Sequence, residues 1–147
     1  MNNETSIQNI ENQLKKLFCS LDSKWVKVSF ILARLDLSFL LESISQRDSI
    51  YSIDSMIKLY IYKRVKGNST YPNLIKELQN NEDFIQLGFT SIPTKRNFNY
   101  FLKSKLNKQI IEQLNSIAEK ILSTATQLGF ILDLEIVKKN IRDYENK

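Results

Sequence analysis

The 147-residue sequence is long enough for one domain with a single core, and its 42% apolar and 25% charged residues are typical of a globular protein rather than a disordered one. Three glycines and two prolines are too few for the many turns of a β-sandwich or β-barrel, so the composition favours helices. The net charge is +5, and the absence of histidine excludes His-containing zinc sites, Ser-His-Asp and Cys-His arrangements and His acid–base catalysis within the chain.

Residues 5–21 are predicted to form an amphipathic helix, because apolar side chains recur there at three- and four-residue spacings. These side chains are Ile7, Ile10, Leu14, Leu17, Phe18 and Leu21. The N-terminal residues show no basic segment followed by an apolar one, and no window reaches about 18 apolar residues. We therefore expect neither secretion nor membrane insertion.

Cys19 is the single cysteine, so the sequence has no disulfide framework and the reducing cytoplasm is the expected compartment. This thiol has no histidine to pair with and no helix start beside it. We expect it to be a small buried apolar group rather than a reactive nucleophile.

Apolar residues are too dense in residues 25–41 for a one-sided helix, so this stretch is predicted to lie mostly in the core. One or two helices are expected, with the Asp36-Leu37-Ser38 turn able to cap the second. A short strand around residues 25–30 is the alternative.

A polar hinge over residues 46–52 leads to an amphipathic helix over residues 53–65, which should end near Gly67. Tyr71-Pro72 then opens a further helix, because proline is well tolerated in a first turn. That helix should end at Asn80-Asn81. A short segment over residues 82–87 follows it and leads to Gly88.

The motif Ile92-Pro93-Thr94 predicts the start of another helix, since proline prevents helix continuation and Thr94 can cap the amides that follow. The apolar face of this helix, over residues 94–106, consists of Phe98, Phe101, Leu102 and Leu106. Its polar residues lie largely on other faces and include Lys95, Arg96, Asn99 and Lys103. A long helix over residues 110–122 follows, and residues 130–132 and 134–137 are β-rich.

Together these elements predict an all-α fold: a compact multi-helix bundle with a helix-turn-helix-like portion and a short β segment at the C-terminus. Residues 1–130 are expected to form the helical domain, and residues 131–147 a tail.

Positive charge is concentrated in residues 58–108, which contain ten lysines and arginines but three acids. A local excess of bases beside aromatic residues suits a polyanion, because lysine and arginine neutralise phosphates with release of counterions. A solvated basic face would have the same composition.

The helix over residues 94–106 has the parts of a helix-turn-helix reader: a short preceding helix, a turn, and an exposed basic start. Lys95 and Arg96 could contact phosphates, and Asn99 could bind an adenine edge. Phe98 and Phe101 share the apolar face and are expected in the core rather than as stacking platforms.

Signals for catalysis are weak. Gly67, Gly88 and Gly129 are too far apart to form a phosphate-binding loop, and each is more simply a helix terminator. Asp133 and Glu135 would share one face of a strand, but no third acid has a place beside them. We expect a solvated strand edge there, and no catalytic site, metal or cofactor.

Three stretches follow one another in residues 53–106: IDSMIKLYIYKRVKGNS, YPNLIKELQNNEDFIQLGF and IPTKRNFNYFLKSKL. They are an apolar helix ending in Gly, a Leu-rich helix leading into Leu-Gly-Phe, and a Pro-started helix with aromatic packing. In order and content they resemble the N-terminal helical domain of insertion-sequence transposases, whose catalytic part is an RNase H-like domain with an Asp-Asp-Glu triad. The preceding LDLSFLLESI looks similar as well, so that the resemblance covers about residues 35–130.

This resemblance implies DNA binding at transposon ends, together with dimerisation, but not transposition. In the family the first catalytic Asp follows the long helix, where this sequence reads GFILDLEIVKKNIRDYENK and stops. Asp133 stands early for that role, and Lys138-Lys139-Asn140 occupy the place of the acid. Because the two-metal chemistry needs three carboxylates, the chain is expected to be inert as a nuclease, its tail a remnant of the first strand of a missing catalytic domain.

The sequence thus predicts a DNA-binding module derived from a transposase. Its expected contacts are Lys95, Arg96, Asn99, Lys103, Lys63, Arg64 and Lys66. One alternative is a protein-interaction module that forms homo-oligomers, or that dimerises with full-length transposase and inhibits it. Another is a basic helical protein that binds RNA or an acidic protein.

Overall fold

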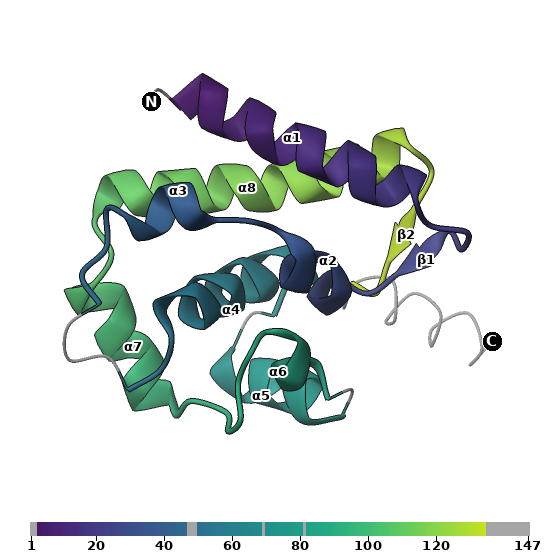
Figure 1. Ribbon diagram of the computed structural model, residues 1–147. Coiled ribbons are helices and arrows are strands. Elements are labelled where there is room, and N and C mark those ends of the chain that lie inside the picture. The colour runs from purple at the N-terminus through teal and green to yellow at the C-terminus, as the bar shows by residue number, and fades with distance from the viewer. Residues whose placement is uncertain (1–2, 47–49, 69, 81, 135–147) are drawn as a thin grey trace.

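The computed structural model describes residues 3–46, 50–68, 70–80 and 82–134. Its elements in chain order are α1 (Asn3–Cys19), β1 (Trp25–Val26), α2 (Val28–Arg34), α3 (Ser38–Leu41), α4 (Ile53–Lys66), α5 (Tyr71–Asn80), α6 (Asp83–Gln86), α7 (Lys95–Ser104), α8 (Lys108–Gln127) and β2 (Ile131–Leu132) (Figure 1). The predicted fold class is confirmed: the chain is a compact, mostly helical bundle with one short two-stranded sheet.

Three helices form the centre of the molecule. The long helix α8 packs against α1 on one side and against α4 on the other (Figure 1). The apolar stripes predicted for α1 and α8 face each other across this contact, and fully buried members include Leu14 of α1 and Leu114 of α8. Each such burial removes apolar surface from water and stabilises the fold by about 1.5–3 kcal/mol.

Helix α4 is buried on more sides than a one-sided amphipathic helix would be. It contacts α8, α2 and α3, and its buried residues include the two lysines Lys58 and Lys66. Lys58 is paired with Asp54 one turn earlier at 3.0 Å. The central position of α4 therefore withdraws part of the basic segment from the surface.

The predicted helix boundaries are confirmed where the sequence supplies a local signal. The hydroxyl of Thr94 accepts a hydrogen bond from the amide of Asn97 at 3.1 Å and caps α7. Gly67 ends α4 with φ of 80°, in the left-handed region that glycine adopts without a steric penalty. At the start of α3, the Asp36 carboxylate accepts from the amide of Ser38 at 3.0 Å, as the predicted turn requires, and hydrogen bonds from Ser38 lower the pKa of Asp36.

The two strands pair in parallel and join segments from opposite ends of the chain, with Trp25 opposite Ile131 and Val26 opposite Leu132. Leu132 is buried, and the ring of Phe130 lies 4.5 Å from that of Phe18. The predicted boundary after residue 130 therefore falls inside the packed unit. The expected tail from residue 135 onward, including Glu135, lies outside the described residues.

Two residues expected in the core are at the surface. Cys19 is exposed, because one helical step of 100° beyond the buried Phe18 turns it away from α8. Trp25 is 58% exposed, since its side chain is on the outer face of β1 while Val26 points inward. None of the helices among the described residues is both long and apolar enough to cross a membrane.

Candidate nucleic-acid interface

Helix α7 is fixed to the domain by its aromatic face. Phe98 and Phe101 are both buried, as predicted, and the ring of Tyr71 packs 5.5 Å from that of Phe98. The Tyr71 hydroxyl donates a hydrogen bond to the carbonyl of Pro93. Burial, followed by the neighbouring Tyr51, raises the pKa of Tyr71 to about 12. These contacts tie the start of α7 to the start of α5.

The opposite side of α7 presents four predicted contact residues to solvent, which we call the α7 stripe: Lys95, Arg96, Asn99 and Lys103. Spacings of three and four residues place Arg96, Asn99 and Lys103 along one face of the helix. No lysine or arginine of the stripe forms an ion pair with another described residue. The structure thus brings these four residues together on a rigidly held helix.

The segment that precedes α7 differs from a compact helix-turn-helix. The predicted order of a short helix, a connection and a basic helix is present, but α6 is a single turn. Residues 87–94 connect it to α7, and this connection is longer than the three or four residues of a helix-turn-helix turn. Helix α7 lies at one side of the bundle (Figure 1), and it is not the second helix of a compact helix-turn-helix.

Lys63 and Arg64 form a second basic group in the last turn of α4. With Tyr60 and Gly67 they line a surface depression of about 350 Å³. This group belongs to α4, whereas the α7 stripe belongs to a different helix.

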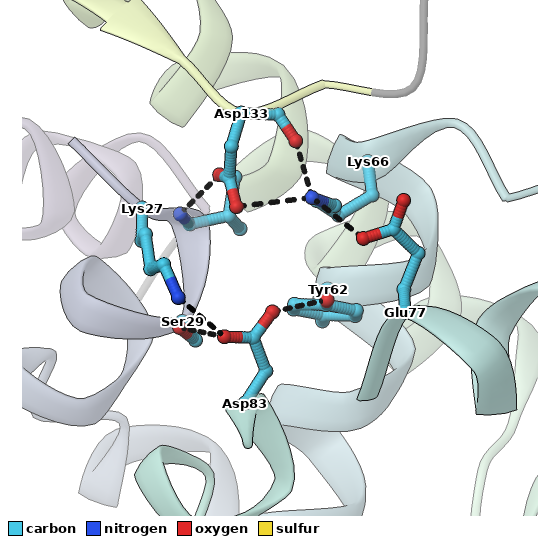
Figure 2. Close-up of polar contacts among 8 residues, drawn as sticks. Lys27, Ser29, Tyr62, Lys66, Glu77, Asp83 and Asp133 are labelled. Carbon is cyan, nitrogen blue, oxygen red and sulfur yellow. Dashed lines mark hydrogen bonds and ion pairs between the residues drawn. The ribbon is translucent and has the colours of Figure 1, made fainter. Parts of the chain in front are cut away.

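Lys66 is a correction to the predicted set. Its side chain is 0% exposed, and its ammonium lies 3.0 Å from a carboxylate oxygen of Asp133 and 3.4 Å from Glu77 (Figure 2). It also donates to the Asp133 carbonyl. Because both acids are distant in sequence, the charges near Lys66 in the sequence do not indicate that it is buried. Lys66 cannot reach a phosphate in this fold.

Asp133 is likewise not the solvated strand edge that its sequence context predicts. Besides pairing with Lys66, its carboxylate accepts a hydrogen bond from the amide of Val28 at 2.8 Å. It thereby satisfies a free amide at the start of α2. In the described part of the chain, no group of three His, Cys, Asp or Glu residues could hold a metal ion.

A polar cluster that the sequence did not predict surrounds Asp83, which is 1% exposed (Figure 2). Its carboxylate accepts hydrogen bonds from Tyr62 at 2.6 Å and from Ser29 at 3.0 Å, and Lys27 lies 3.6 Å away. Burial and the hydrogen bond to Asp83 raise the pKa of Tyr62. All the acceptor oxygens of Asp83 are engaged within the protein.

The Asp83 cluster borders a surface depression of about 380 Å³ that is lined by both apolar and polar side chains. Trp25 and Ile85 stand at this depression with 58% and 57% of their surface exposed, and Phe30 also lines it. Two large apolar side chains around one depression are typical of a binding surface rather than of a scattered exposed residue. Nothing in the local sequence around Ile85 indicates that it is exposed.

Comparison with protein-family models, curated proteins and solved structures finds no significant match for this chain. The relationship to transposases that the sequence predicts stays a prediction. Two surfaces of the structure are candidate binding sites: the α7 stripe, and the depression between Trp25 and Ile85.

Proposed function

We propose that this chain is a DNA-binding module whose α7 stripe contacts the phosphate backbone. One observation carries the proposal: the stripe holds three cations and an asparagine, all exposed, on a helix whose aromatic face is buried in the core. In the described structure these cations have no internal partner to lose on binding. Their neutralisation of phosphates would release counterions, which favours association.

The dimensions of α7 fit this role. An α-helix with its side chains is about 10–12 Å wide, close to the width of about 12 Å of the major groove of B-DNA. Lys95, Arg96 and Lys103 would contact phosphates, and Asn99 has the amide geometry that pairs with an adenine edge. Lys63 and Arg64 would add phosphate contacts outside the stripe, whereas Lys66 is excluded by its burial.

The proposal includes the origin that the resemblance implies, which is the end-binding domain of a transposase without catalytic activity of its own. In that role the module would occupy transposon ends and require no metal or cofactor. The binding argument rests on the α7 stripe and does not depend on this origin.

The test is fluorescence anisotropy with a duplex from the ends of a neighbouring insertion element and with a scrambled duplex, across a salt series. Lys95→Ala/Arg96→Ala should weaken binding and reduce the slope of log K against log salt by about 1.8, since each phosphate contact contributes about 0.9. The matched control is Lys15→Ala/Lys16→Ala, which removes two exposed lysines of α1 and should leave the slope unchanged.

Absence of binding to either duplex at low salt would overturn the proposal. Equal losses in both double variants would also count against it, because they would show a response to net charge rather than to the α7 stripe. Stronger binding to RNA or to an acidic polypeptide would instead favour the alternative of a basic helical protein with such a partner.

The depression between Trp25 and Ile85 favours a second candidate function, a protein-interaction module. Its partner would be a second copy or a full-length transposase, and contact would bury the two exposed apolar side chains. Trp25→Ala and Ile85→Ser should then abolish association in sedimentation velocity, whereas Lys95→Ala/Arg96→Ala should leave it intact. A wild-type chain that stays monomeric and does not bind the transposase would contradict this candidate.

A further inference from the structure

Tyr100 is an exposed aromatic residue of α7 beside the α7 stripe. Its side chain is 59% exposed, and it follows Arg96 by four residues and precedes Lys103 by three. On a helix these spacings make the three side chains neighbours on one face. Tyr100 therefore lies within two helical turns of both exposed cations, with one on each side of it along α7.

The exposure of Tyr100 is not explained by packing within the domain. Its hydroxyl forms no hydrogen bond and its ring no ring contact with another residue that the structure describes. By contrast, Tyr60 donates to Asn115 at 2.9 Å and Tyr62 donates to Asp83. The depression beside Tyr100 measures about 70 Å³, far below the 300 Å³ or more that a small-molecule site requires. Tyr100 offers an aromatic surface rather than a pocket.

An aromatic ring between cations suits a nucleotide whose base is unpaired. Bases stack on aromatic side chains while the backbone follows basic residues, and both contacts contribute to binding of single strands. In a fully paired duplex the faces of the bases are covered by their neighbours. The same helix that contacts phosphates would therefore distinguish exposed bases from paired ones.

We propose that the α7 stripe binds nucleic acid at unpaired nucleotides, with the Tyr100 ring stacked on a base and Arg96 and Lys103 on the flanking phosphates. This inference rests on the proposed DNA-binding function and narrows its substrate class to single-stranded or locally opened DNA. Single-stranded RNA would offer the same unpaired bases and phosphates, so the experiment compares a DNA oligonucleotide with an RNA oligonucleotide.

The experiment measures anisotropy of the full chain with four labelled probes of equal length: a paired duplex, the duplex with an unpaired central base, a thymidine oligonucleotide and a uridine oligonucleotide. Wild type should bind the unpaired probes more tightly than the duplex. Tyr100→Ala should lose about 5- to 150-fold on the unpaired probes and little on the duplex, as one stacking contact implies. Tyr100→Phe retains the ring and should keep the preference.

Ile131→Ala is the control, because Ile131 is another exposed apolar side chain, 42% exposed, but belongs to β2, far from α7 (Figure 1). It should bind all probes like wild type. A second readout is 2-aminopurine at the unpaired position, whose fluorescence should be quenched by wild type and Tyr100→Phe but not by Tyr100→Ala.

Failure of wild type to bind any probe overturns the DNA-binding function and this inference together. Binding that is equal in wild type and Tyr100→Ala, with no quenching of 2-aminopurine, overturns the stacking role alone and leaves the DNA-binding function standing. Tighter binding of the uridine strand than of the thymidine strand, lost in Tyr100→Ala, supports stacking but makes RNA the ligand, which overturns the proposed DNA binding.

Discussion

The ammonium of Lys66 lies 3.0 Å from the carboxylate of Asp133, and this ion pair joins the end of α4 to the residue after β2. The same carboxylate accepts the amide hydrogen of Val28 at the start of α2. One side chain thereby connects three elements (Figure 2). Asp133 thus has a structural role in the fold.

Asp133→Ala should destabilise the protein by about 3 kcal/mol or more, because it leaves the fully buried Lys66 with fewer partners. Lys66→Met should cost less, since the carboxylates of Glu77 and Asp133 keep partial contact with water. Urea unfolding followed by circular dichroism measures both. Lys15→Ala, which breaks an exposed pair with Glu11, is the control and should change stability by less than about 1 kcal/mol. Similar small effects for all three variants would contradict the role of the buried pair.

The helix boundaries could be predicted because their signals are local. Gly67 and Thr94 act on the backbone within one turn, and the periodic apolar residues of α7 define which face is buried. The pairing of Trp25 with Ile131 could not be predicted, since two-residue strands carry almost no pattern and the partners are distant in sequence.

The candidate site could be predicted only where its residues depend on local signals. Amphipathic spacing separates Phe98 from the α7 stripe without knowledge of the tertiary fold. The burial of Lys66 depends on its ion pair with Asp133, and only the folding of the whole domain brings these two residues together. The exposure of Tyr100 and Ile85 also depends on the tertiary fold. The sequence identifies both as residues that can be buried, but it does not show whether another element covers them.

Tyr62→Phe should destabilise the protein by about 1–3 kcal/mol, because it removes a donor from the buried carboxylate of Asp83. Tyr60→Phe is the matched control: it removes a hydroxyl whose partner, Asn115, is partly exposed and can bind water instead. Urea unfolding should therefore rank Tyr62→Phe as the more damaging change. The reverse ranking would show that Asp83 does not depend on this hydrogen bond.

Stability should fall at alkaline pH through Tyr71. Its pKa is raised from 10.0 to about 12, mainly by burial, so the folded protein holds this proton more tightly than the unfolded chain. The resulting contribution is present below about pH 10 and is lost as the pH rises toward 12. Tyr71→Phe should make the fall of unfolding free energy across this range shallower, and Tyr62 acts in the same direction in both proteins. Carbon-13 labelling of tyrosine Cζ reports the titration, and a Tyr71 midpoint near pH 10 would contradict the prediction.

Gly88 should tolerate alanine less well than Gly67, although both have positive φ, 95° and 80°. In each case an alanine adopts the left-handed region at a cost of about 1–2 kcal/mol. At Gly88 the added Cβ would also lie 2.7 Å from the Ser55 hydroxyl oxygen, whereas at Gly67 it would meet nothing within 4 Å. This overlap should add about 1–3 kcal/mol to the cost of Gly88→Ala.

The double variant Ser55→Ala/Gly88→Ala isolates the overlap from the backbone strain. Removing the hydroxyl leaves the Ser55 Cβ at 3.9 Å, an ordinary contact distance, so the cost of Gly88→Ala should fall to about that of Gly67→Ala. Urea unfolding of the single and double variants gives the coupling free energy between positions 55 and 88. If the free-energy changes of Ser55→Ala and Gly88→Ala simply add in the double variant, the prediction is wrong. Additivity would mean that the loop before α7 moves away from α4 and accepts the methyl group without overlap.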